Sequence, residues 1–298
     1  MSTASGKVIL LGEHAVVYGR PALAAAVSPG VEAQACASDE DGVSLCVAPW
    51  EKTFCTGDGS DLAQALAVLA SRFGGARVHL DATMHLPGGG GLGSSASLGV
   101  ACIRAVAEYK GETLSDEALL DAALAWEKVF HGNPSGVDHT LAALGGVGVF
   151  VRGQGLDRIA LKAPVRVCIA DSGERGSTKE MVAQVARIRE RNPAHAEKVF
   201  DAIAALVRNG ALALSAGDLR AFGELMNLNQ SLLAGLMVST ERLETLCAAA
   251  RDAGAFGAKL TGAGGGGCVI ALAGEREREV LDAWRANGAK VAVTEVAG

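Results

Sequence analysis

Two carboxylates flank a short glycine-containing turn in the segment WEKVFHGNPSGVDHT, residues 126–140. Helical spacing on both sides of the turn predicts Glu127 in the last turns of one helix and Asp138 in the first turn of the next. The helix dipole does not favour a carboxylate near a helix C-terminus, so Glu127 calls for another explanation. Carboxylates placed in this way can hold a cation or accept a proton. The plain alternatives are a solvated surface Glu and an ordinary acid at a helix start.

A glycine-rich loop with two serines precedes a predicted helix in PGGGGLGSSAS, residues 87–97. Glycines allow a ligand to approach the backbone closely, and a helix N-terminus offers unpaired N–H groups and partial positive charge. This arrangement suits phosphate groups, and the hydroxyl of Ser94 or Ser95 is placed to reach a magnesium ion that bridges them. A flexible turn is the plain alternative. The residues assigned to this phosphate-binding loop are Gly88, Gly89, Gly90, Gly91, Gly93, Ser94 and Ser95.

A second glycine-rich loop, centred on Gly264, lies in KLTGAGGGGCVIAL, residues 259–272. Four consecutive glycines cost backbone entropy, so we expect a ligand or another backbone to approach there, and we take the loop as a wall of the phosphate site. A plain turn remains possible. Both loops match G-x-G-x-x-G, but the first helix is followed by a second helix and not by a strand, which argues against a dinucleotide site. No G-x-x-x-x-G-K-[ST] occurs, which excludes a P-loop.

The elements that must position these residues follow from hydrophobic periodicity and turn signals. Predicted strands cover residues 7–11, 29–38, 42–48, 77–84, 147–152, 165–171, 268–272 and 290–296. Predicted helices cover residues 94–110, 115–131, 135–145, 177–192, 195–209, 217–234, 239–252 and 275–286. Ser115 is a good N-cap for the second of these helices.

A polar, glycine-containing stretch before Pro164 predicts a domain boundary. We therefore expect an α+β fold in two domains, residues 1–160 with the first loop and Asp138, and residues 161–298 with the second loop.

Composition excludes several classes of function. A net charge of −6 without a Lys/Arg-rich run argues against a nucleic-acid partner. Polar residues interrupt every apolar stretch before about 18 positions, so neither a membrane span nor a signal peptide is expected. Seven cysteines and six histidines are scattered without metal-ligand spacing, which indicates a reducing, cytoplasmic setting, cysteines in the core and no protein-only metal cage. Trp50 and Trp126 are expected in the core, and His131 and His139 as imidazoles that cap the turn.

Four segments in the same order carry a resemblance to the mevalonate kinase family. They are GKVILLGEHAVVYGRPALA (6–24), PGGGGLGSSAS, EKVFHGNPSGVDHTL and KLTGAGGGGCVIAL, and together they extend from Lys7 to Leu272. The segment DSGERGSTKEMV (171–182) points the same way, and GEHAVVYG differs from the GEHTDYN typical of the related galactokinases. The resemblance therefore covers nearly the whole chain.

The resemblance implies a reaction and a role for each site residue. ATP would phosphorylate mevalonate to 5-phosphomevalonate, in isoprenoid precursor synthesis, with Mg²⁺ held by Ser95 and Glu127. Asp138 would be the catalytic base and Lys7 its cationic neighbour. Glu13 and His14 would lie in the substrate-binding segment, with Thr178 near the reacting end, while Ser94 and the loop from Gly88 to Gly93 would cradle the phosphates.

The resemblance also implies an N-terminal domain with a left-handed βαβ unit and a ferredoxin-like C-terminal domain, in a monomer or homodimer. Two other functions stay open. A phosphomevalonate kinase should need more Lys or Arg for its phosphorylated acceptor than Lys7 and Arg20, the only ones of these types in the first 30 positions. A catalytically silent metabolite-binding protein should have lost Lys7, Glu127 or Asp138, and all three are present.

Overall fold

The computed structural model describes residues 1–48, 50, 52–75, 77–85, 90–132 and 134–296. Gly88 and Gly89 of the predicted phosphate loop lie outside the described residues. The chain forms two compact units that exchange segments along the sequence. Unit 1 comprises Met1–Gly6, Ser28–Gly88 and Gly93–Gly145, and unit 2 comprises Lys7–Val27, Gly89–Leu92 and Gly146–Gly298. The division of the sequence after residue 160 stays a prediction.

A parallel strand pair joined through a helix is the centre of unit 1. Strand β3 (Val43–Ala48) runs parallel to β5 (Val78–Met84), and α1 (Asp61–Arg72) lies between them in the chain, which makes a βαβ unit. Strand β4 (Lys52–Cys55) pairs with β3 on its other side, and the later part of β2 (Ala22–Ala37) pairs antiparallel with β5. Alternation of buried and partly exposed residues along β3 matches the two-residue period of a strand with one buried face.

Three further helices complete the core of unit 1. They are α2 (Ser94–Tyr109), α3 (Asp116–His131) and α4 (Val137–Leu144). The Ser115 side chain accepts a hydrogen bond from the Ala118 N–H, as predicted for an N-cap, at 3.2 Å. Buried apolar residues of α1, α2 and α3 meet those of β3 and β5 in one hydrophobic cluster. Burial against this cluster, more than local propensity, stabilises helices of this length.

A four-stranded antiparallel sheet with the order β11-β8-β10-β9 organises unit 2. Its strands are β8 (Val165–Asp171), β9 (Gly257–Thr261), β10 (Cys268–Leu272) and β11 (Lys290–Val296). Its helices are α5 (Thr178–Arg191), α6 (Pro193–Ala216), α7 (Leu219–Gly235), α8 (Glu241–Asp252) and α9 (Glu277–Ala286). Along the chain this reads strand, helices, two strands, helix and strand, the βαββαβ order of a ferredoxin-like arrangement.

The remaining elements of unit 2 are short strands and 3₁₀ helices together with the part of β1 that belongs to this unit. Strand β1 (Ser2–Leu11) continues into this unit from Lys7 and is followed by the short 3₁₀ helix η1 (Ala15–Tyr18). The start of β2 pairs antiparallel with β6 (Val147–Val151), which pairs in turn with β7 (Gly155–Arg158), and η2 (Gly274–Arg276) precedes α9. The mixed content of the two units, with its βαβ and βαββαβ arrangements, confirms the predicted fold class.

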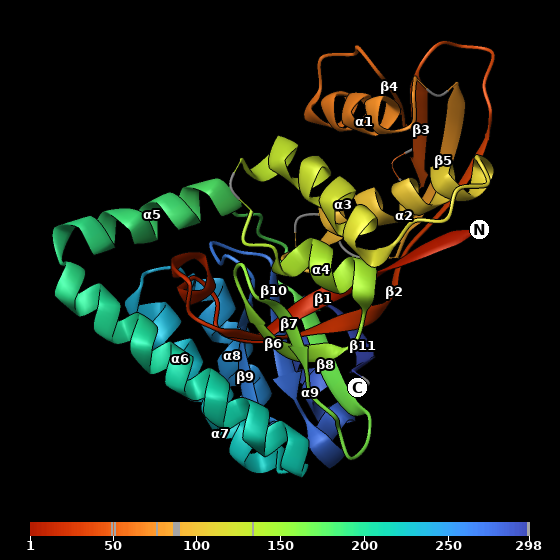
Figure 1. Ribbon diagram of the computed structural model, residues 1–298. Helices are drawn as coiled ribbons and strands as arrows, with labels where there is room; N and C mark the ends of the chain where they lie inside the picture. Colours follow the sequence, from red (N-terminus) through yellow and green to blue (C-terminus); the bar gives the residue numbers. More distant parts are fainter. Residues whose placement is uncertain (49, 51, 76, 86–89, 133, 297–298) are drawn as a thin grey trace. The chain divides into compact units, whose positions relative to one another are not determined.

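Helix α6 is the single described helix that is long and apolar enough to cross a membrane by length and composition. Its Phe200 and Ile203 are buried in the core of unit 2, and it runs beside α7 (Figure 1). Its Glu197 and Asp201 form ion pairs with Arg20, at 2.8 and 2.9 Å. These contacts are those of a helix packed within a folded unit.

Several elements differ from the sequence-based expectation. Helix α1 was not expected, although Ser60 caps it and Leu62, Leu66 and Leu69 are buried. Strand β9 was taken as part of a loop, and β4 and β7 were not expected. Helix α6 runs to Ala216 and continues through Gly210, where an added Cβ would lie 2.3 Å from Cδ1 of Leu11.

Two expectations about burial were partly wrong. Trp126 is buried, but Trp50 is 45% exposed and lies edge-on to Phe54. Four cysteines are buried, and burial raises the pKa of their thiols to about 12, so they are unreactive core residues. These four are Cys102, Cys168, Cys247 and Cys268, whereas Cys36 is exposed and Cys46 and Cys55 are half-buried.

Candidate active site

A hydroxyl and a carboxylate meet in unit 1 where α2 begins. Gly93, in the left-handed region with φ 72°, precedes α2, and Ser95 lies in its first turn. The Ser95 hydroxyl donates a hydrogen bond to Oε1 of Glu127 at 2.6 Å. Glu127 is only 1% exposed and lies in the last turns of α3, as the sequence predicts, with Nε2 of His131 3.7 Å from its Oε2. Two residues 32 positions apart thus form one oxygen-donor pair.

Trp126 fixes the backbone beneath this pair. Its indole N–H donates to the Ser95 carbonyl oxygen at 3.1 Å. Its ring lies so close to Gly99 that a Cβ there would come within 2.5 Å of a ring atom. The glycine therefore lets α2 and α3 approach each other closely at this point.

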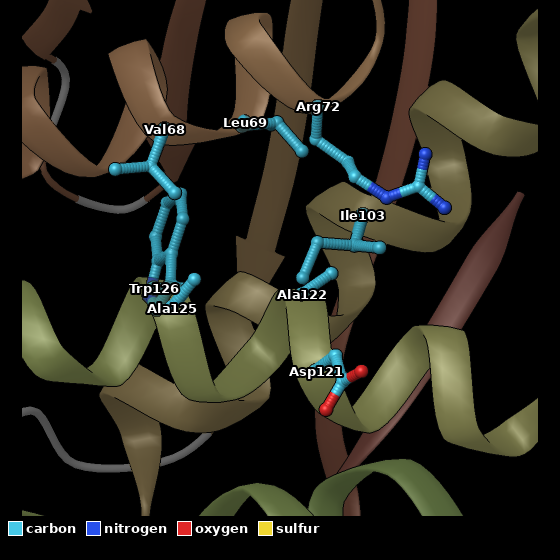
Figure 2. A pocket seen from close by; sticks show the side chains of 8 residues that line it. All are labelled: Val68, Leu69, Arg72, Ile103, Asp121, Ala122, Ala125 and Trp126. Carbon is cyan, nitrogen blue, oxygen red and sulfur yellow. The ribbon is translucent and has the colours of Figure 1, made fainter.

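A mostly apolar pocket of about 170 Å³ in unit 1 also has Trp126 in its wall (Figure 2). The pocket is lined by Val68, Leu69, Arg72, Ile103, Asp121, Ala122, Ala125 and Trp126, which come from α1, α2 and α3. Trp126 thus contacts both the pocket and the backbone of Ser95, whereas the side chains of Ser95 and Glu127 do not line the pocket.

The Ser95–Glu127 pair fits a magnesium ion. Mg²⁺ prefers oxygen ligands and is usually held by one or two protein groups together with waters and substrate phosphates. A buried carboxylate and a hydroxyl side by side supply such a donor set. Within the described residues no cluster of three or more His, Cys, Asp or Glu forms a protein-only metal cage.

Asp138 occupies the first turn of α4, a helix that begins directly after Gly136, whose φ is 102°. Its side chain is half-buried. The neighbouring His139 is buried, which lowers the pKa of its imidazole, although the charge of Asp138 opposes this effect. That His131 and His139 cap the turn stays a prediction; His131 is the last residue of α3, and His139 is buried in α4.

Lys7 holds the end of the first glycine-rich loop within unit 2. Its backbone N–H donates to the Leu92 carbonyl at 2.9 Å, and its ammonium donates to the Gly91 carbonyl at 2.9 Å. The side chain is buried, with 3% exposed. The Cys268 N–H binds the Gly90 carbonyl at 3.1 Å, so the strand after the second glycine-rich loop contacts the first loop directly.

The second loop owes its glycines to other parts of the backbone. A Cβ at Gly264 would lie 2.2 Å from the Val238 carbonyl oxygen, and one at Gly262 would lie 2.9 Å from the Cα of Gly91. The Gly265 N–H donates to the Val238 carbonyl at 2.8 Å. Close backbone approach, one of the two causes expected from the sequence, thus accounts for much of the run.

A strained turn follows the Glu13 position in unit 2. His14 has φ 60° and ψ −47°, and the Ala15 N–H donates to the Glu13 carbonyl at 2.7 Å, which makes a γ-turn of the rare, strained kind. The His14 ring nitrogen Nε2 lies 2.8 Å from the Ala263 carbonyl oxygen. Since that oxygen can only accept, Nε2 carries the proton. Burial lowers the pKa of His14, which favours the neutral ring.

The Glu13 carboxylate is fully occupied by neighbours. Its Oε1 pairs with the ammonium of Lys259, and its Oε2 accepts from the Asn229 side-chain amide at 3.2 Å. Burial raises the pKa of Glu13 and lowers that of Lys259, while their mutual attraction opposes both shifts. Sequence reasoning missed Lys259 and Asn229. These contacts favour a positioning role for Glu13 over direct contact with a substrate.

Thr178 is exposed at the first position of α5, after the N-cap Ser177. The segment that leads to it is held by a bidentate ion pair between Arg175 and Asp171, at 2.7 and 2.8 Å. Within unit 1 the structure thus joins Ser95 and Glu127. Within unit 2 it joins Lys7 to the first glycine-rich loop and His14 to the second.

Two families of domains match the chain. Residues 61–146 match the GHMP kinases N terminal domain, and residues 202–290 match the GHMP kinases C terminal domain. The chain is 38% identical to the mevalonate kinase of Pyrococcus horikoshii, over 99% of this chain and 95% of that protein.

Solved structures agree with this similarity. The chain superposes on L. major mevalonate kinase in complex with R-mevalonate with a TM-score of 0.89 and 27% identity, covering 99% of this chain and 95% of that one. It superposes on the Methanococcus jannaschii mevalonate kinase with a TM-score of 0.86 and 26% identity, covering 99% of this chain and 97% of that one.

Proposed function

Because the chain belongs to the GHMP kinase family, with mevalonate kinases as full-length relatives, we propose that it transfers the γ-phosphoryl group of ATP to (R)-mevalonate. The product is 5-phosphomevalonate, in the mevalonate pathway of isoprenoid precursor synthesis. The structural observation that carries the proposal is the buried Ser95–Glu127 oxygen pair, directly after a glycine-rich loop at a helix N-terminus.

Phosphoryl transfer depends on positioning and charge neutralisation more than on covalent chemistry by the protein. The N-terminus of α2 and the loop from Gly88 to Ser94 bind the phosphates through backbone N–H groups. Ser95 and Glu127 would hold Mg²⁺, which would supply positive charge against the phosphates. Gly264 and its neighbours shape the second loop, whose Ala263 carbonyl orients the His14 ring.

Asp138 takes the proton of the attacking hydroxyl, and the Lys7 ammonium stabilises the negative charge that develops there. His14 binds mevalonate through its second ring nitrogen, Nδ1, because Nε2 is already bound to Ala263. Thr178 lies near the reacting end of the alcohol. The protein works in the cytoplasm as a monomer or homodimer, on a small-molecule substrate and without a nucleic-acid or membrane partner.

An ADP-release assay with Mg-ATP tests the function. Mevalonate, phosphomevalonate, galactose and homoserine are offered as acceptors, with and without Mg²⁺. Magnesium-dependent turnover with mevalonate alone is expected. Turnover with phosphomevalonate instead would show that the acceptor is wrong and that ATP-dependent phosphorylation of an alcohol is right. No turnover with any acceptor would favour a silent metabolite-binding protein.

A further inference from the structure

Lys259 is a buried ammonium that the proposed reaction does not use. It lies in β9 with no exposed surface. Besides Glu13 it donates to the Leu260 carbonyl at 2.5 Å and lies 3.4 Å from the Ile9 carbonyl oxygen. Removing an ammonium from water is costly unless such partners compensate for its lost hydration. A well-packed apolar side chain would serve stability at least as well at such a position, so the charge calls for another explanation.

The Lys259 contacts converge on the strained turn at His14. Glu13 begins the γ-turn, and its carboxylate is held from both sides, by Lys259 of β9 and by Asn229 of α7. His14, at the centre of the turn, is held by the Ala263 carbonyl. Lys259 and Ala263 are only four residues apart, so one continuous segment clamps two consecutive residues of the turn.

A strained backbone persists only where its surroundings determine it, and such residues concentrate at functional sites. We propose that Lys259 is a positioning residue that, through Glu13, keeps the His14 turn in the shape that binds the alcohol substrate. The inference rests on the proposed function for its kinetic test, because that test uses mevalonate. The proposal requires that Lys259 affect the binding of the alcohol acceptor and leave the binding of ATP unchanged.

The double variant Lys259→Met with Glu13→Gln is the direct test. It removes both charges together, so neither is left buried without its partner, and the side-chain volumes are nearly conserved. We expect the KM for mevalonate to rise at least about tenfold, with the KM for ATP within about twofold of wild type. A fall in Tm with an unchanged KM for mevalonate, or an equal rise in both KM values, would overturn the proposal.

Gln230→Met is the matched control. Gln230 is buried on α7 beside Asn229 and accepts from the Leu260 N–H at 2.9 Å, and its amide NH₂ donates to Ser239 and Glu244 on the side of α8. This variant should lower Tm and keep the KM for mevalonate. If the double variant does not fold, Asn229→Ala takes its place as the test. It removes one donor to Glu13 and should raise the KM for mevalonate about threefold.

Histidine side-chain NMR of the same proteins separates this inference from the proposed function. His14, identified by the signal missing in His14→Asn, should titrate below the ordinary histidine range in the wild type and in Gln230→Met. In the double variant its titration should move towards the ordinary range, whichever alcohol the enzyme uses. A His14 titration unchanged in the double variant would overturn the positioning role, and an enzyme inactive on mevalonate would overturn only the function.

Discussion

At the scale of single residues, the proposed chemistry depends most on the Asp138 carboxylate. Asp138→Asn is nearly isosteric and removes the base, so turnover should fall at least about 100-fold while ATP binding stays close to wild type. Single-turnover kinetics and calorimetric titration with a non-hydrolysable nucleotide measure the two effects. Asp252→Asn, at an exposed position that ends α8, is the matched control. Turnover of Asp138→Asn close to wild type would remove Asp138 from the mechanism.

The oxygen pair in unit 1 makes a separate residue-level prediction about Mg²⁺. Glu127→Gln keeps a carbonyl oxygen that can accept from Ser95 but removes the negative charge, and Ser95→Ala removes the hydroxyl. Both changes should raise the Mg²⁺ concentration for half-maximal activity, by about 10- to 100-fold for Glu127→Gln and less for Ser95→Ala. Titration of free Mg²⁺ at saturating ATP measures this, and an unchanged requirement in Glu127→Gln would mean that the pair is structural.

At the scale of elements, the contact between the two glycine-rich loops predicts the effect of a single methyl group. Gly91 has φ 79°, and its added Cβ would lie 2.5 Å from the Thr261 carbonyl oxygen, whereas Gly111, with φ 69°, faces open space. Alanine at either position should cost about 1–2 kcal/mol of unfolding free energy for its left-handed backbone. Gly91→Ala should cost clearly more in urea titrations and raise the KM for ATP. Equal losses of unfolding free energy in Gly91→Ala and Gly111→Ala would show that the two loops can move apart to accommodate the added methyl group at little cost.

Local patterns predicted the elements that carry their own signals. The N-cap Ser115 and the apolar face of α3 predicted the position of Glu127 near the end of that helix. The first glycine-rich loop and its serines predicted the start of α2. Lys259 could not be found in this way, because its partner Glu13 is 246 positions away and a strand lysine is usually exposed. The buried strand β9 was not predicted, because Lys259 and the glycines after it are not typical of a buried strand. Pairing with β10 and packing against α7 and α8, not local sequence, make it a strand.

At the scale of the whole molecule, buried neutral histidines make stability depend on pH. Burial lowers the pKa of His14 and His139 in the folded chain, while both return to about 6.5 when it unfolds. Between the lowered values and about pH 6.5 the unfolded chain binds more protons, so stability falls as the pH falls through this window. Each histidine contributes at most about 1.4 kcal/mol per pH unit. Above about pH 7 both rings are neutral in either state, and this contribution no longer changes with pH.

Glu13 acts in the opposite sense, because burial raises its pKa, so that just above pH 4.5 the folded chain binds this proton more readily than the unfolded chain does. The net slope from pH 7.5 to 5.0 should therefore be smaller than two histidines alone would give. Urea unfolding at half-unit pH steps measures this slope in the wild type and in His139→Gln. His139→Gln should flatten the slope of the wild type, whatever it does to stability at pH 7.5. A slope that His139→Gln leaves unchanged would mean that the ring titrates alike in the folded and unfolded chain, with the charge of Asp138 offsetting the effect of burial.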